Sequence, residues 1–263
     1  MSWDALHSWV GHAGPFALAT IAALGILVLL HRRRAGIVAW LDARLPPGPR
    51  QRAVVMMALA AGTVGMFAKA AEDVANLEST EFDRAASLLL HRLDSPIMDA
   101  AMRIASALGS WPAIVVAIAL TAAWCLVRRA RLAASVLIGV VAGTEFLNLL
   151  LKHAFGRARP ALFHEVPVPP SYSFPSGHTM MAAATYGIIA FVVSRELPAV
   201  RWRPFVAASA LVFLVGMSRI FLGVHWATDV LGGLAGGTFG LLVGAVILEM
   251  SVSRRATRNG EPR

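Results

Sequence analysis

Long apolar stretches alternate with short charged segments along this chain of 263 residues, a pattern that predicts membrane-spanning helices. A span needs about 20 residues, within a range of roughly 17–25, so several stretches must include flanking residues. The sixth is expected to extend through 220–222 and bring Arg219 to the membrane surface. Glycine and alanine are frequent inside the stretches, which favours close helix packing in lipid and an all-α fold. The seven stretches are Pro15–Leu30, Ala53–Ala68, Trp111–Val127, Ala133–Leu151, Thr179–Val193, Phe205–Met217 and Val230–Met250.

The segment between the second and third stretches has a different pattern. Thr80–Ala107 carries apolar residues at helical spacing, and Ser95-Pro96 is typical of the start of a second short helix. Charged residues interrupt each apolar run, so these two helices are expected to lie along the outer interface rather than to cross it. Val166–Pro175 contains four prolines and is predicted to be an irregular loop.

Composition agrees with a membrane protein. The chain is 57% hydrophobic and 15% charged, with a mean hydropathy of +0.64. Its single cysteine, Cys125, lies in an apolar stretch, where core packing is the expected role. The proline-rich connection Leu45–Pro49 marks a candidate boundary. We therefore predict an N-terminal spanning helix with its cytoplasmic connection over residues 1–52, followed by a core over residues 53–263.

Positive charge predicts how the helices cross the membrane. Segments 31–52, 128–132, 194–204 and 251–263 hold 16 of the 24 Lys and Arg residues but only three of the 15 acidic residues. The positive-inside rule places these segments in the cytoplasm, with the N-terminus outside and the C-terminus inside. The net charge of +9 is thus a topology signal. A nucleic-acid partner, which would need basic residues clustered on a soluble face, is not expected.

The fragment Ser218-Arg219-x5-His225-x3-Asp229 is the strongest chemical signal. His225 and Asp229 are four residues apart, so the carboxylate can accept the imidazole N–H and leave the other ring nitrogen free to attack. Acid, histidine and arginine are costly beside a membrane unless they serve a function. Metal binding is the rival interpretation, but the chain has no HExxH motif or cysteine cluster, and nearby cations would repel a metal ion.

Pro175-Ser176-Gly177-His178 directly precedes an apolar stretch. Ser176 is therefore the expected N-cap of a helix, with His178 in its first turn. Free amides at a helix N-terminus bind anions, and glycine allows close approach of the backbone. The alternative is a purely structural cap with an incidental histidine.

Lys152 and Arg159 lie seven residues apart, which would place them on one helix face, but Gly156 and Pro160 predict that the helix unwinds before Arg159. In both cases two cations meet at the end of the fourth stretch. Either these two cations take part in the function of the protein, or they are interfacial side chains that extend from the membrane toward water. His153, next to Lys152, is not expected to belong to the site, so replacing it tests which histidines are assigned to the chemistry.

Two polar residues lie inside the fourth stretch, Glu145 and Asn148. Glu145 precedes Lys152 by seven residues and shares its helix face. The pair either supports Lys152 or forms a local hydrogen bond against the helix.

The three fragments, in this order, resemble the three-part signature of the type 2 phosphatidic-acid phosphatase superfamily, which includes membrane lipid phosphate phosphatases and the soluble vanadium haloperoxidases. The resemblance covers roughly Phe82 to Met250. It implies a six-helix membrane core, to which this chain adds one N-terminal helix, and a reaction without metal or other cofactor. It also implies His225 as nucleophile, Asp229 as its partner and His178 as general acid. The implied phosphate ligands are Lys152, Arg159, Ser176, Gly177 and Arg219.

The sequence therefore predicts a polytopic, all-α membrane phosphatase, expected in a bacterial inner membrane with its site on the extracytoplasmic face. Its substrate would be a phospholipid or polyprenyl phosphate: undecaprenyl diphosphate, phosphatidic acid or phosphatidylglycerol phosphate. Two alternatives remain open. One is a lipid phosphotransferase that uses the same phosphohistidine, and the other is a lipid transporter or binding protein without enzymatic activity.

Overall fold

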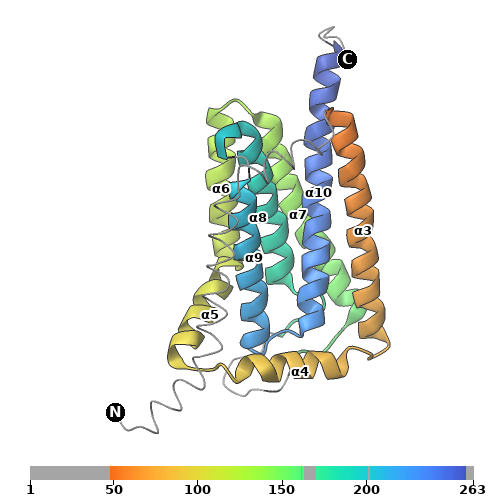
Figure 1. Ribbon diagram of the computed structural model, residues 1–263, viewed down its shortest axis with the longest axis vertical. Coiled ribbons are helices and arrows are strands. Elements are labelled where there is room, and N and C mark those ends of the chain that lie inside the picture. The colour runs from red at the N-terminus through yellow and green to blue at the C-terminus, as the bar shows by residue number, and fades with distance from the viewer. Residues whose placement is uncertain (1–47, 161, 163–169, 201, 259–263) are drawn as a thin grey trace, which may run out of the picture. The chain divides into compact units, whose positions relative to one another are not determined.

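Helices account for the regular structure of the described residues, in which no strand occurs. The computed structural model describes residues 48–160, 162, 170–200 and 202–258 (Figure 1). Its elements are α3 (Pro49–Ala75), α4 (Thr80–His91), α5 (Pro96–Leu108), α6 (Trp111–Val127), α7 (Arg131–Phe155), α8 (Gly177–Glu196), the 3-10 helix η1 (Pro198–Val200), α9 (Arg203–Phe221) and α10 (Ala227–Arg258). The predicted all-α fold is confirmed.

Six of the seven predicted apolar stretches fall in the described residues, and each forms a helix there, namely α3 and α6 to α10. Five helices of this part are long and apolar enough to cross a membrane, or six if α5 and α6 form one span bent by 49°. The seventh stretch, Pro15–Leu30, lies outside the described residues. Because α3 begins at Pro49, the predicted division after residue 52 falls inside this helix, and the domain division stays a prediction.

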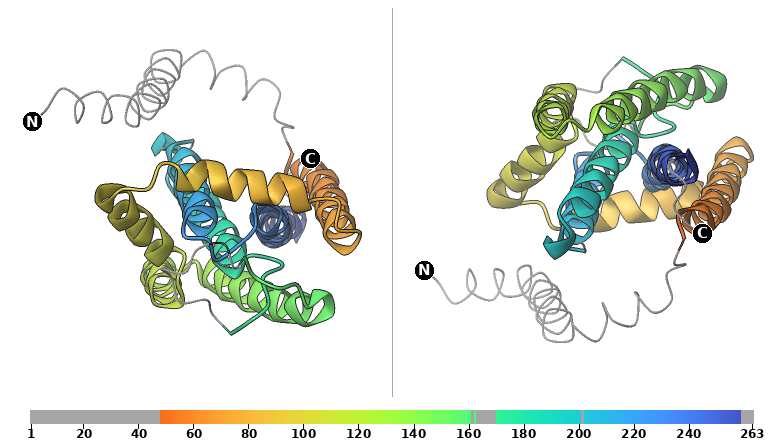
Figure 2. Two further views of the ribbon diagram at one scale, coloured as in Figure 1. Left: turned by 90° about the horizontal axis from the view of Figure 1, so that it is seen from below. Right: turned by 90° about the horizontal axis from the view of Figure 1, so that it is seen from above.

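The long helices run alternately up and down, and α4 lies across one end of them (Figures 1 and 2). As predicted, α4 therefore follows the end of the bundle rather than its length. The same end receives the C-termini of α7 and α9 and the N-termini of α8 and α10. Segments that lie far apart in the sequence consequently meet beside α4.

The α8 helix packs against α6, α7, α9 and α10. Small residues of α10 bring its backbone close to α8, because a Cβ atom at Gly233 would lie 2.6 Å from the carbonyl oxygen of Ser176. Glycine at such contacts lets membrane helices approach closely. By contrast, α3 exposes Val54, Leu59 and Met66 on a largely apolar surface, as expected of a helix in contact with lipid.

The orientation of α5 differs from the sequence expectation. We expected α5 to lie along the interface, but it packs against α9 and continues into α6 across the break at Gly109 and Ser110. A Cβ atom at Gly109 would lie 3.3 Å from the Cβ of His178, so glycine allows this close crossing. The apolar residues Met98 and Met102 pack against the segment after α9, which turns α5 toward the bundle.

Candidate active site

The three sequence fragments meet at the end of the bundle that α4 covers. A cavity of about 190 Å³ lies there. Six of the eight predicted site residues line it: Lys152, Arg159, Gly177, His178, Arg219 and His225. Ser176 and Asp229 lie directly behind this lining and are fully buried. The structure thus brings the predicted residues together, three cations and two histidines around one cavity.

His225 and Asp229 form a buried pair. Nδ1 of His225 lies 3.3 Å from Oδ2 of Asp229, and Nε2 lies 3.0 Å from Nη1 of Arg159. An arginine can only donate, so Nε2 is the acceptor and Nδ1 carries the proton that is donated to Asp229. Burial lowers the pKa of the His225 imidazole to about 4, and the hydrogen bond to Asp229 offsets only part of this effect. At neutral pH the ring therefore presents an unprotonated Nε2.

The contact with Arg159 bears on the rival metal interpretation. A guanidinium, not an empty coordination position, lies next to the free nitrogen of His225. Both carboxylate oxygens of Asp229 already accept hydrogen bonds from protein groups. This arrangement suits an anion better than a cation.

Arg159 belongs to an irregular segment rather than to α7. The α7 helix ends at Phe155, and its C-cap, Gly156, has φ of 57°, a left-handed conformation that glycine adopts without strain. The predicted unwinding before Arg159 is confirmed. Nε of Arg159 donates to the carbonyl of Ser171 at 2.7 Å, and Nη1 donates to the carbonyl of Val224 at 2.7 Å. Backbone carbonyls therefore aim the guanidinium at the cavity.

Lys152 lies in the last turn of α7 and is only 8% exposed. Its Nζ donates to the carbonyl of Tyr172 at 2.6 Å. Glu145 and Asn148 line the same cavity, but Nδ2 of Asn148 donates to Oε2 of Glu145 at 3.4 Å. The structure shows this local hydrogen bond, while support of Lys152 by the pair stays a prediction.

Gly177 and His178 begin α8, and Ser176 is its N-cap residue as predicted. The amide of Ser176 donates to the carbonyl of Asp229 at 2.9 Å, so the start of α8 is fastened to the start of α10. The hydroxyl of Ser176 accepts from Thr179 at 3.1 Å rather than capping the helix. The first amides of α8 have no acceptor within the helix and lie at the cavity beside His178.

Arg219 occupies the last turn of α9 and is buried. Its Nη1 donates to the hydroxyl of Ser106 on α5. The unexpected orientation of α5 thus has a role at the site, because α5 holds this arginine against the cavity.

His153 lies outside the cavity. It is exposed, and its Nδ1 lies 2.8 Å from the carbonyl of Leu149 in the preceding turn. A hydrogen bond within its own helix accounts for this residue.

A network behind the His225–Asp229 pair was not predicted from the sequence and is formed by Arg157, Asp83 and Thr228. Nη1 of Arg157 lies 2.6 Å from Oδ1 of Asp229, and Nη2 lies 2.7 Å from Oδ2 of Asp83. One signal was present in the sequence: Asp83 shares the apolar face of α4 with Ala86 and Leu90, where a charged residue calls for a partner. No spacing rule connects it to a residue 74 positions away.

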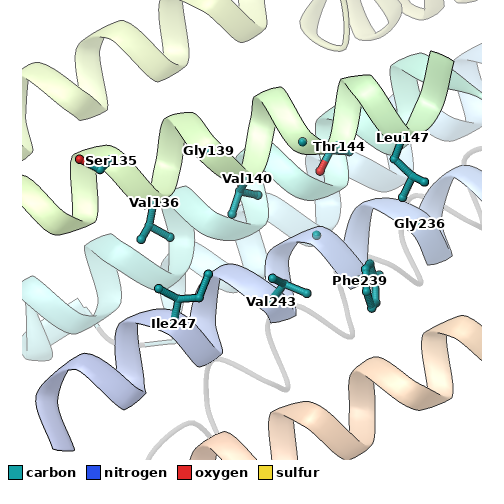
Figure 3. A pocket seen from close by; sticks show the side chains of 12 residues that line it. Ser135, Val136, Gly139, Val140, Thr144, Leu147, Gly236, Phe239, Val243 and Ile247 are labelled. Atoms are coloured by element: carbon teal, nitrogen blue, oxygen red, sulfur yellow. The ribbon is translucent and has the colours of Figure 1, made fainter. Parts of the chain in front are cut away.

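A second pocket lies between α7 and α10 and has a volume of about 420 Å³ (Figure 3). Ser135 and Thr144 contribute hydroxyl groups, and the other lining side chains are apolar or glycine. None of its lining residues is charged, so this pocket offers no cation to balance the charge of a phosphate group.

Comparison with known proteins agrees with the sequence pattern. The model of the PAP2 superfamily matches residues 133–253. The chain is 43% identical over 105 residues to phosphatidylglycerophosphatase B of Bacillus subtilis, which is 37% of this chain and 50% of that protein. It is 34% identical over 136 residues to lipid A 1-phosphatase of Rhizobium etli, which is 48% of this chain and 55% of the relative. The matches thus span about half the length of these curated relatives.

The fold comparison extends further along the chain. A transmembrane PAP2-type phosphatidylglycerolphosphate phosphatase from Bacillus subtilis has a similar structure, with a TM-score of 0.66 and 28% sequence identity. The similarity covers 74% of this chain and 96% of that chain. Residues 133–253 of this helical membrane protein thus form a domain that matches the PAP2 superfamily, also called the type 2 phosphatidic-acid phosphatases.

Proposed function

We propose that this protein is a metal-independent phosphatase that hydrolyses lipid-linked phosphate monoesters or diphosphates through a phosphohistidine. One observation carries the proposal: a neutral His225, oriented by Asp229, presents Nε2 to a cavity lined by three cations. The phosphatase names of the relatives support the same reaction class.

The reaction has two steps. Nε2 of His225 attacks the phosphorus, a P–N bond forms, and the bond to the leaving oxygen breaks as His178 donates a proton to that oxygen. His178 then takes a proton from water, whose oxygen attacks the phosphorus. The P–N bond breaks and phosphate is released. Lys152, Arg159, Arg219 and the first amides of α8 hold the phosphoryl oxygens throughout.

An apolar groove supports a lipid substrate. It has a volume of about 730 Å³ and lies between α4, α8, α9 and α10. Thr179, the residue after His178 in α8, is among its lining residues. We propose that this groove receives the acyl or prenyl chain of a substrate whose phosphate binds in the cavity.

The test is phosphate release by the purified protein from undecaprenyl diphosphate, phosphatidic acid and phosphatidylglycerol phosphate in mixed micelles. Release from at least one lipid is expected. Adding glycerol or another alcohol separates a phosphatase from a phosphotransferase, because a transferase would form a new phosphate ester in place of free phosphate. Lipid movement across vesicles without any release would instead support a transporter.

Metal independence is the first specific prediction. Three side-chain cations already balance the charge that builds up on the phosphoryl group, so activity is expected to survive excess EDTA. Vanadate should inhibit, because it can occupy the five-coordinate geometry of the transition state. Loss of activity in EDTA that Mg²⁺ restores would overturn the proposal of a metal-free site.

The site is proposed to face the extracytoplasmic side of a bacterial inner membrane, with the C-terminus in the cytoplasm. The basic segment around Arg128–Arg131 joins α6 to α7 at the end opposite the site, which supports this orientation. Reporter tags after Pro49 and after Gly260 should report the cytoplasm, and a tag within 166–170 the outside. A cytoplasmic signal from 166–170 would invert the orientation and require cytosolic headgroups as substrates.

A further inference from the structure

Arg157 joins two buried carboxylates that lie far apart in the sequence. Its Nη1 lies 2.6 Å from Oδ1 of Asp229, and its Nη2 lies 2.7 Å from Oδ2 of Asp83. The side chains of Asp229 and Asp83 are 0% and 1% exposed, and that of Arg157 is 15% exposed. Buried carboxylates need a counter-charge, and one guanidinium supplies it to both. Arg157 is not among the residues that line the cavity, so its role differs from that of Arg159.

Asp83 also binds the first turn of α10. Its Oδ1 accepts from the amide of Thr228 at 2.8 Å, and its Oδ2 accepts from the hydroxyl of Thr228 at 2.7 Å. The first amides of a helix lack partners within that helix, so Asp83 acts as a cap supplied by a distant segment. The α4 helix is thereby fastened to the turn that carries Asp229.

These contacts leave Asp229 with a single orientation. Oδ1 accepts from Arg157, while Oδ2 accepts from the amide of Trp226 at 2.9 Å and faces Nδ1 of His225 at 3.3 Å. Rotation of the carboxylate would break the bond to Arg157 and the bond to His225 together. The guanidinium of Arg157 also lies over the ring of Trp226, at 5.7 Å from the ring centre, which holds the arginine from its other face.

We propose that Arg157 and Asp83 are positioning residues that act through Asp229 to fix the tautomer and direction of the His225 ring, so that α4 is part of the catalytic apparatus. The inference rests on the proposed phosphatase function. Neither residue touches the substrate in this scheme. Their loss therefore affects the chemical step more than binding.

The charges of Arg157 and Asp83 predict the direction in which each substitution shifts the pH dependence of kcat/KM. The groups that face the pair are Arg157 behind Asp229, Asp83 from α4, Lys152 from α7, His178 from α8, Arg219 from α9 and Arg159 from the loop. Removing the positive charge of Arg157 favours the protonated pair, so the acid limb of kcat/KM should move to higher pH. Removing the negative charge of Asp83 acts in the opposite direction.

The experiment compares Arg157→Gln, Arg157→Lys and Asp83→Asn with the full-length wild type in micelles of the lipid that it hydrolyses best. Arg157→Gln is expected to lower kcat about 10- to 100-fold, by analogy with groups that orient metal-bound histidines, with little change in KM. The midpoint of the acid limb in its kcat/KM profile should move up by about one pH unit, which is the effect of one nearby charge. Arg157→Lys should restore the pH profile but only part of kcat, because one ammonium cannot bind two carboxylates in this geometry. Asp83→Asn should lower kcat while its acid limb stays in place or moves to lower pH.

Arg103→Gln is the matched control, since Arg103 pairs with Asp99 at 2.7 Å on the exposed surface of α5. It should behave like the wild type. Equal acid limbs in the wild type and Arg157→Gln, or a rise in KM with unchanged kcat, would overturn the inference. If Arg157→Gln does not fold, Asp83→Asn and Arg157→Lys still decide it through kcat and the acid limb. A wild-type protein that releases no phosphate from any lipid refutes the proposed function itself, which is a different outcome.

Discussion

Replacing His225 with alanine is expected to abolish both turnover and any covalent phosphoenzyme. The residue supplies the only ring nitrogen at the cavity that Asp229 orients, with Nε2 free of its own proton. Without it no P–N bond can form. The measurement is phosphate release together with trapping of acid-labile phosphate after a short reaction with radiolabelled substrate. Acid-labile phosphate trapped on the His225→Ala protein would refute the assignment of the nucleophile.

The same experiment on His178→Ala gives the complementary result. His178 begins α8 beside the anion site, and its assigned role is to carry a proton rather than to form a bond to phosphorus. Turnover of lipids should fall strongly. With a nitrophenyl phosphate, whose leaving group needs no proton, the phosphohistidine should still form and accumulate because water activation is slow. His153→Ala is the control and should keep most of its activity, since this ring lies outside the cavity.

Asp229→Asn is expected to lower kcat by about 10²–10⁴, by analogy with the orienting carboxylate of a serine-protease triad. The amide that replaces the carboxylate offers one oxygen, but the native side chain uses two, toward Arg157 and toward His225. If the amide oxygen faces Arg157, the amide nitrogen faces Nδ1 and favours the tautomer with Nε2 protonated. That tautomer cannot attack.

The measurement for Asp229→Asn is kcat at several pH values, with thermal unfolding recorded in parallel. Asp99→Asn is a suitable control because Asp99 pairs with Arg103 on the exposed surface of α5. Wild-type kcat in a folded Asp229→Asn protein would show that His225 does not need this partner. A protein that unfolds early but turns over normally when cold would assign Asp229 a structural role alone.

Sequence predicted the helices well because lipid imposes a simple pattern. Each spanning helix must be about 20 residues long and apolar, so its position can be seen in the chain itself. The candidate site could also be located from the sequence, since Lys152, His178 and His225 lie at or near the ends of such stretches. Because successive helices alternate in direction, the C-termini of α7 and α9 and the N-termini of α8 and α10 lie at one end of the bundle, where the three fragments meet.

The orientation of α5 and the Arg157 network were missed for a common physical reason. Both depend on contacts between residues far apart in the chain: Arg219 with Ser106, and Arg157 with Asp83. Hydrophobic periodicity reports which face of a helix is buried but not which neighbour buries it. The charge of Asp83 on an apolar face indicated that a partner was needed, while the identity of that partner required the folded structure.

The close contact of α8 and α10 has a consequence for how such proteins diversify. Gly233 leaves no room for a side chain beside Ser176, and the amide of Ser176 is bonded to the carbonyl of Asp229. The supports of His178 and His225 therefore form one frame, in which a sideways shift of either helix would change the distance between the two rings. The groove walls on α4 and α9 lie outside that frame. Under the proposed function, groove residues such as Leu89 on α4 and Phe213 on α9 can vary with the lipid tail while Asp83 and Arg219 on the same two helices stay fixed. Selection for substrate and selection for rate would then act on different residues of one helix.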